Sequence, residues 1–187
     1  MSQYFKLSKK GFSLIEMLLV LGVLAVLLIA SFIVYPKISV AKQADTEVKN
    51  AIMVMNRMET IFGGKSSGVG TGVANQARVF PSSMNGGNYA ASAPIRSAWG
   101  GNVRISTMGV AMYDLIYENV SPEICLELLP KLTINFQWVQ IQQGSAGGGA
   151  QTWLKNPGHN LNNPSTSTLV NACTNNGSAF VLAIGYK

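Results

Sequence analysis

One carboxylate stands inside the most apolar stretch of the chain. From Phe12 to Pro36 the sequence reads FSLIEMLLVLGVLAVLLIASFIVYP, and Glu16 is its only charged residue. An unpaired carboxylate in an apolar segment that enters lipid costs roughly 3 kcal/mol, so such a residue indicates a function and a partner of opposite charge. In a medium of low dielectric constant Glu16 would attract a cation strongly. The alternative is a side chain that reaches back to the polar interface near the start of the helix.

The other groups that could do chemistry do not form recognisable sites. Gly64-Lys65-Ser66 is similar to the end of a phosphate-binding loop, but Glu59 replaces the first glycine of that motif, and a helix precedes it. The lone histidine, His159, has no second histidine or cysteine thiolate to complete a metal site. The arginines and aromatic residues are too scattered to predict a nucleic-acid surface. We therefore expect no enzymatic activity, no cofactor, no metal and no nucleic acid.

Two cysteines, Cys125 and Cys173, are the remaining candidates for covalent chemistry. In a chain whose body lies outside a membrane, one disulfide between them is the natural interpretation, and it indicates an oxidising compartment. Such a bridge would close a loop of about 49 residues, which the loop-entropy relation values at roughly 4 kcal/mol.

The composition allows one compact domain with one appendage. The 187 residues are 48% hydrophobic and 12% charged, with a formal net charge of +6. As a helix, the stretch from Phe12 to Pro36 would be roughly 37 Å long, sufficient to cross a bilayer. Three lysines among the first ten residues place the amino terminus in the cytoplasm and the chain after Pro36 outside. An uncleaved anchor and a secretory signal cut near Ser39-Val40-Ala41 both remain open at this point.

The apolar helix should continue beyond Pro36 as an amphipathic one. Apolar residues recur there at steps of three and four, and no helix stop occurs before Gly63-Gly64. Ser13 to Phe62 is therefore predicted as one helix of about 75 Å. The recurring residues are Ala41, Ala44, Val48, Ala51, Met55, Met58 and Phe62.

From Gly63 onward, frequent turn residues separate short elements. Ser121-Pro122 is typical of a helix start, and it predicts a short helix over Cys125 to Leu129. A second short helix is expected from Ser165 or Thr166 to near Cys173. Strands are predicted over Asn102 to Thr107, Leu132 to Gln142 and Ala179 to Tyr186. We expect them to form an antiparallel sheet packed on the amphipathic half of the long helix.

The amino terminus resembles a known processing signal. Lys9-Lys10-Gly11-Phe12-Ser13-Leu14-Ile15-Glu16-Met17-Leu18 is similar to the class III signal of type IV prepilins, which has a basic leader, a glycine and an apolar helix with glutamate as its fifth residue. The resemblance implies that a membrane-embedded prepilin peptidase cuts between Gly11 and Phe12 and that the new amino group of Phe12 is methylated. It also implies that Glu16 pairs with the terminal ammonium of Phe12 on a neighbouring subunit during assembly.

The resemblance extends more loosely over the body and favours the type IVb pilins. The segments that carry it are Trp99-Gly100-Gly101-Asn102-Val103, Pro122-Glu123-Ile124-Cys125 and Leu169-Val170-Asn171-Ala172-Cys173. It implies an α+β pilin fold, with a protruding apolar helix, an antiparallel sheet and a disulfide-bounded carboxyl-terminal region. The expected parts are a cleaved leader (1–11), a long helix (12–62, with a membrane or filament-core half at 12–36 and an amphipathic half at 37–62) and a globular head (63–187).

The function implied is that of a subunit polymerised into a pilus for adhesion, aggregation or conjugative mating-pair contact. The implied partners are further copies of the chain, the prepilin peptidase, the pilus assembly machinery of the inner membrane, and a host or recipient-cell surface. The subunit would sit in the inner membrane of a Gram-negative bacterium, with its head in the periplasm, and then in an extracellular pilus. The alternatives are a pseudopilin of a type II secretion system and a monomeric exported binding protein or enzyme held by an uncleaved anchor.

Overall fold

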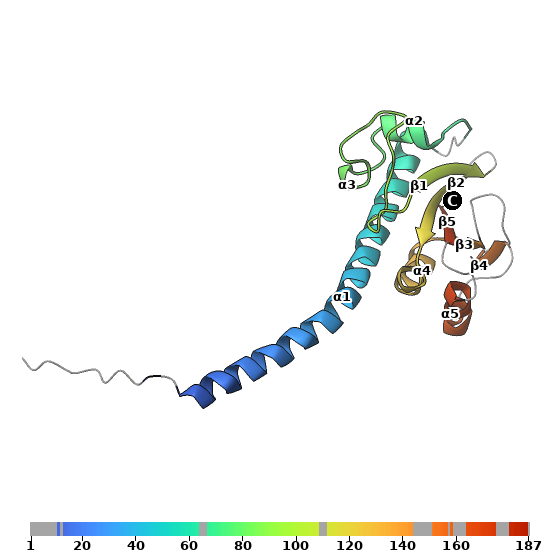
Figure 1. Cartoon of the computed structure of the whole chain (residues 1–187). Helices are drawn as coiled ribbons and strands as arrows, with labels where there is room; N and C mark the ends of the chain where they lie inside the picture. The colour runs from blue at the N-terminus through green and yellow to red at the C-terminus, as the bar shows by residue number, and fades with distance from the viewer. Residues whose placement is uncertain are drawn as a thin grey trace, which may run out of the picture. The chain divides into compact units, whose positions relative to one another are not determined.

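The structure is a computed structural model of the chain, and it describes residues 11, 13–63, 67–108, 112–143, 151–156, 158, 164–174 and 180–186. The chain divides into two compact units, Met1–Ser39 and Val40–Lys187. Helix α1 (Leu14–Phe62) contributes its first part to one unit and its second part to the other (Figure 1). The long helix predicted over Ser13 to Phe62 is therefore confirmed to within one residue, and it includes Pro36.

A five-stranded antiparallel sheet forms the centre of the second unit. The strands are β1 (Val103–Met108), β2 (Met112–Val120), β3 (Trp138–Gln143), β4 (Gln151–Lys155) and β5 (Phe180–Tyr186). Their order in space is β1-β2-β5-β3-β4, and each neighbouring pair is antiparallel. The last strand of the chain thus lies in the middle of the sheet. The expected antiparallel sheet is confirmed, whereas β2 and β4 were missed from sequence.

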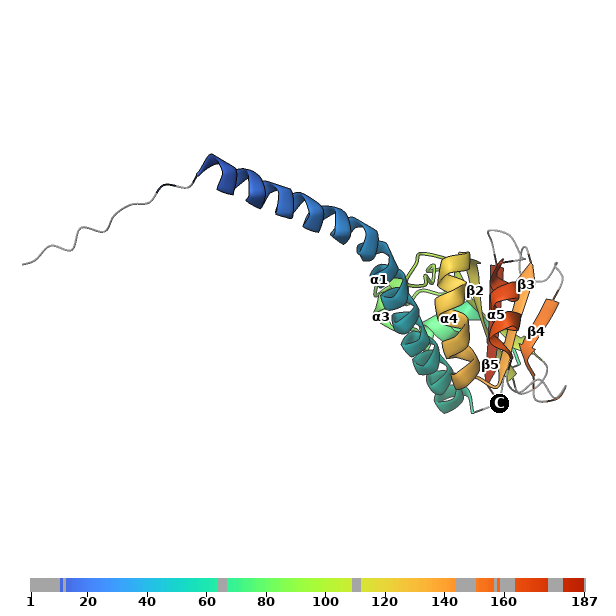
Figure 2. The same cartoon turned by 90° about the horizontal axis from the view of Figure 1, so that it is seen from below.

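Two helices lie side by side along this sheet, as Figure 2 shows. Helix α4 (Pro122–Asn135) begins where predicted, with Ser121 as its cap, because the Ser121 hydroxyl accepts a hydrogen bond from the Ile124 amide at 3.4 Å. Helix α5 (Thr166–Thr174) begins after Ser165, whose hydroxyl accepts from the Thr168 amide at 3.2 Å. Two shorter helices, α2 (Thr71–Gln76) and α3 (Ser82–Asn85), precede the sheet.

The strand predicted over Leu132 to Gln142 is wrong in its first half. Helix α4 continues to Asn135, and β3 begins only at Trp138. The apolar residues Leu128, Leu129 and Leu132 of α4 are fully buried at helical spacing, so core packing extends the helix beyond the predicted Leu129. The alternation that suggested a strand is accidental, because Ile134 is 80% exposed at the end of the helix.

The hydrophobic core lies between the second part of α1, helix α4 and one face of the sheet. The predicted apolar stripe of α1 supplies Ala44, Val48, Ala51, Met55 and Met58, all of which are buried. The sheet supplies alternate residues of its strands, and α4 supplies its leucines. Because α1 provides one wall of this core, the head and the second part of the helix form a single packed body.

Candidate functional site

The first part of α1 is apolar on every side. Its large side chains are between 47% and 79% exposed from Leu14 to Phe32, with no buried face to set against a polar one. Among the described residues, α1 is the one helix long and apolar enough to cross a membrane, judged by length and composition. A helix with this surface requires lipid or other apolar helices around it.

Glu16 lies in the first turn of this apolar helix. The helix begins at the Ser13 carbonyl, which accepts hydrogen bonds from the amides of Glu16 at 3.0 Å and Met17 at 3.2 Å. A negative side chain in the first turn interacts favourably with the helix dipole. The carboxylate is exposed, and the described residues provide no cation or hydrogen-bond donor for it. Its partner must therefore come from elsewhere.

The residues of the predicted cleavage site are only partly described. Gly11 is exposed, and a side chain added there would meet no atom within 4 Å. Phe12 and the leader before Gly11 lie outside the described residues, as does His159. The proposed pairing of Glu16 with the amino group of Phe12 therefore stays a prediction.

The two cysteines form a disulfide that joins α4 to α5. The Cα atoms of Cys125 and Cys173 are 5.7 Å apart, and the two residues are 48 positions apart in the chain. Both are buried and belong to the same core as the sheet. The bridge expected from the sequence is present, and it ties the carboxyl-terminal region to α4, which shares the core with α1.

A buried carboxylate on α1 was missed by the sequence analysis. Glu47 is fully buried, and its Oε2 accepts hydrogen bonds from the Ala98 amide at 2.8 Å and from the Asn50 side chain at 3.4 Å. Its Oε1 has no hydrogen-bond partner among the described residues, and burial raises the pKa of the carboxyl despite those hydrogen bonds. Burial and the neighbouring Glu47 raise the pKa of the Tyr117 hydroxyl well above its usual value.

The signal for Glu47 was present in the spacing. It lies three residues after Ala44 and four before Ala51, so it falls on the stripe that was predicted to face the core. The contact with Ala98 fixes the segment between α3 and β1 to the long helix. The spacing therefore indicated that Glu47 is buried, but not that it binds the Ala98 amide, 51 positions along the chain.

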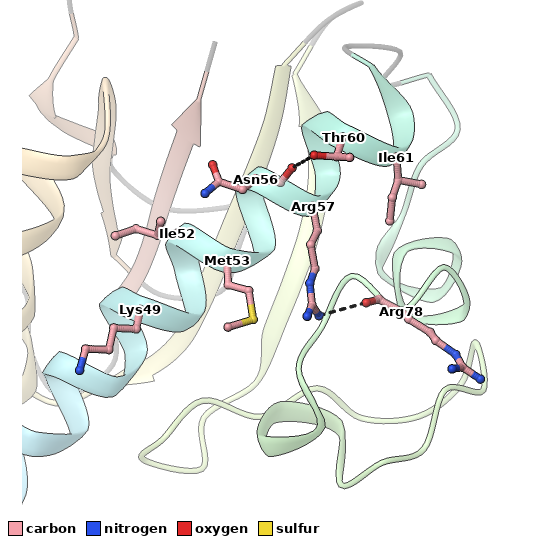
Figure 3. A pocket seen from close by; sticks show the side chains of 8 residues that line it. All are labelled: Lys49, Ile52, Met53, Asn56, Arg57, Thr60, Ile61 and Arg78. Carbon is pink, nitrogen blue, oxygen red and sulfur yellow. Dashed lines mark hydrogen bonds between the residues drawn. The ribbon is translucent and has the colours of Figure 1, made fainter.

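A shallow groove of about 660 Å³ runs along the exposed side of the second part of α1 (Figure 3). Arg57 donates to the carbonyls of Arg78 and Val79 at 3.2 Å each and so holds the loop after α2 against the helix. Arg78 in turn lies 5.2 Å from the centre of the Tyr89 ring. The lining consists of Lys49, Ile52, Met53, Asn56, Arg57, Thr60, Ile61 and Arg78. This lining contains no pair of acid and base, or of nucleophile and base, that could perform catalysis.

The comparisons with known proteins cover nearly the whole chain. The family model described as "PilS N terminal" matches residues 41–184, and the model of the prokaryotic N-terminal methylation motif matches residues 6–32. Among solved structures the chain is similar to that of TcpA, a type IV pilin from Vibrio cholerae El Tor biotype. The TM-score is 0.51 at 13% identity, over 78% of this chain and 99% of that one, so this likeness concerns the fold alone. No curated protein matches the chain significantly.

Proposed function

The chain belongs to the PilS N-terminal family and is a type IV pilin precursor, and from this premise we propose that it is the structural subunit of a type IVb pilus. Processing by a prepilin peptidase and polymerisation follow from the methylation motif at residues 6–32. The cut between Gly11 and Phe12, the methylation of Phe12 and the docking role of Glu16 are part of the proposal.

The observation that carries the proposal is an isolated carboxylate at one end of a helix that is apolar on all sides. Transferring ten Leu, Ile or Val side chains from water into contact with sister helices is worth some 15 to 30 kcal/mol before ordering costs. This gain does not by itself favour one axial position of a helix against its neighbour over another. An ion pair between Glu16 and the amino group of Phe12 on the next copy would fix the axial position, because a copy at any other position leaves two charges unpaired in an apolar core.

Open, head-to-tail contacts of this kind generate a filament and not a closed ring. The precursor is anchored by its apolar helix before assembly and is part of the pilus afterwards. We place the anchored form in the inner membrane of a Gram-negative bacterium, with the head in the periplasm. The assembled fibre would serve in adhesion, aggregation or mating-pair contact, with a host or recipient-cell surface as its partner.

Replacing Glu16 by alanine tests the docking role. We expect Glu16→Ala to be cleaved at the normal rate but to form no fibres, as measured by amino-terminal sequencing and by electron microscopy of sheared surface material. Glu59→Ala is the matched control, because Glu59 is an exposed acid on the other end of the same helix. Normal piliation by Glu16→Ala would refute the ion pair.

The amino terminus of the mature chain separates the remaining alternatives. A terminus at Phe12, especially a methylated one, supports the pilin. A terminus at Lys42 would indicate an ordinary secretory signal, and one at Met1 or Ser2 a simple anchor for a monomeric protein. Abundant long fibres would then exclude a pseudopilin of a type II secretion system.

A further inference from the structure

The groove on the second part of α1 combines an apolar floor with positive charge. Met53 and Ile61, which belong to the floor, are 40% and 47% exposed. Lys49 and Arg78 stand beside the floor, and none of the described residues that line the groove is acidic. Lys49 forms no hydrogen bond or ion pair with any described residue. An exposed apolar surface with charge at its rim is typical of a site that binds another protein.

Arg78 occupies a backbone position that favours glycine. It follows helix α2 with a φ of 59°, and its amide donates to the Asn75 carbonyl at 2.9 Å, which closes the helix. A residue other than glycine is uncommon in this left-handed conformation. Arg57 holds the Arg78 carbonyl, as Figure 3 shows, and the Arg78 guanidinium lies 5.2 Å from the centre of the Tyr89 ring. The chain therefore keeps a positive side chain at the groove although the backbone alone would favour glycine there.

The exposed side of α4 has the complementary character. Glu123 and Glu127 are exposed one turn apart, and Leu126 between them is 39% exposed. Glu123 forms no ion pair with any described residue, and Glu127 lies 3.8 Å from Lys131, which is a weak contact at an exposed site. The residues Glu123, Leu126 and Glu127 form the α4 ridge, in which an apolar side chain lies between two negative charges.

The groove and the α4 ridge are similar in length and lie on different sides of α1. Residues 49–61 of α1 span about 18 Å, and the 14 residues of α4 span about 21 Å. In both Figure 1 and Figure 2, α3 lies on one side of the second part of α1 and α4 on the other. Because Arg78 belongs to the segment between α2 and α3, one copy can present its groove to one neighbour and its ridge to another.

We propose that the groove binds the α4 ridge of a second copy of this chain, with Leu126 on the apolar floor and the two acids beside Lys49 and Arg78. Opposite charges at the rim select this surface over others. Two grooves face to face would bring like charges together, which disfavours a closed dimer. A contact between two different surfaces repeats from copy to copy and generates an open chain. The proposal rests on the function proposed above, and it adds a contact between heads to the contact between apolar helices.

The first test is a zero-length cross-link in native fibres. A water-soluble carbodiimide joins a lysine amine directly to a carboxylate that touches it, and mass spectrometry of the digested fibres identifies the joined peptides. We expect Lys49 joined to Glu123 or Glu127, together with a ladder of covalent oligomers on denaturing gels. The control is the Glu16→Ala chain in micelles of a polyoxyethylene alkyl ether. We expect this chain not to polymerise, so the same cross-link should be absent from it.

The second test reverses the charges on each surface. Lys49→Glu with Arg78→Glu reverses the groove, and Glu123→Lys with Glu127→Lys reverses the α4 ridge. Either pair of substitutions should lower the yield of fibres about tenfold or more, because attractions across the contact become repulsions. A chain with all four substitutions should regain most of the native yield, because opposite charges then face each other again.

Two single substitutions on α1 are the matched controls. Lys42 and Glu59 are exposed on the same helix, and neither lines the groove. Lys42→Glu and Glu59→Lys should therefore leave the yield of fibres unchanged. The urea midpoint of every variant in the same micelles shows whether its head folds. If a variant does not fold, the cross-link in the native chain decides the proposal.

Three results would overturn the proposal. The first is native fibres in which Lys49 is joined to neither acid of the α4 ridge. The second is a native yield from both reversed pairs, or a yield that stays low in a folded chain with all four substitutions. The third is a cross-linked product that stops at the dimer. Absence of fibres from the native chain would refute the proposed function and this contact with it, whereas native fibres with any of the three results refute this contact alone.

Discussion

Removing the disulfide should cost the head a large part of its stability. The bridge joins Cys125 to Cys173 across 48 positions of the chain. In the loop-entropy relation, a closed loop of this length lowers the entropy of the unfolded chain by about 14 cal/mol/K, which is about 4 kcal/mol at 25 °C. Domains of this size are stable by only about 5–15 kcal/mol in total.

The perturbation is the double substitution Cys125→Ala with Cys173→Ala. Both side chains are buried, so the substitution also removes packing around each sulfur. Reduction of the unchanged protein with dithiothreitol breaks the covalent bond and leaves the sulfur atoms in place. Both species lack the covalent bond, but only the double variant lacks the sulfur atoms. The difference between their free energies of unfolding therefore measures the contribution of packing, and the difference between the reduced and the oxidised protein measures that of loop closure.

The assay is unfolding of the full chain by urea in micelles of a polyoxyethylene alkyl ether, followed by tryptophan fluorescence. We expect the free energy of unfolding to fall by about 4 kcal/mol in the reduced protein, with a larger m-value because the unfolded chain exposes more surface. A loss below about 1 kcal/mol with an unchanged m-value would refute the reasoning. In cells, the double variant should also yield less folded exported subunit.

Two further substitutions test the contacts made by the segment before β1. Glu47→Gln removes a carboxylate whose pKa is raised by burial. Because the native protein should lose stability as the pH rises through that pKa, the free energy of unfolding of the variant, relative to that of the native protein, should be higher at pH 8 than at pH 5. The same pH dependence in both proteins would contradict this prediction. Gly101→Ala places a methyl group against the Glu118 carbonyl and 2.7 Å from the Trp99 indole nitrogen, which should cost about 1–3 kcal/mol in the same assay. Gly70→Ala, where the added methyl group meets no atom within 4 Å, is the control and should unfold nearly as the native chain does.

Elements with strong local signals were predictable from the sequence. The apolar run, the stripe from Ala44 to Met58 and the cap at Ser121 depend on residues within one or two turns of helix. Local signals also placed most of β1 and all of β5. The leader motif around Gly11 and Glu16 is local too, which is why the class of protein was recognisable before any fold was known.

Elements whose identity depends on distant partners were not predictable. Helix α4 continues to Asn135 because Leu132 packs into a core built by α1 and the sheet. The central place of β5 is determined by pairing with β2 and β3, and neither of these strands is its neighbour in sequence. Asp114 of β2 and Trp138 of β3 are both paired with Gly185 only as a result of that strand order.

The sequence by itself thus determined the apolar helix, its one acid and the two cysteines, because each is a property of a short stretch of chain. The tertiary structure decided that the buried Glu47 contacts Ala98, which strand is central and which side chains share one face of the sheet. Long-range contacts and strand order are properties of pairs of segments far apart in the chain, and no local pattern of residue types encodes them.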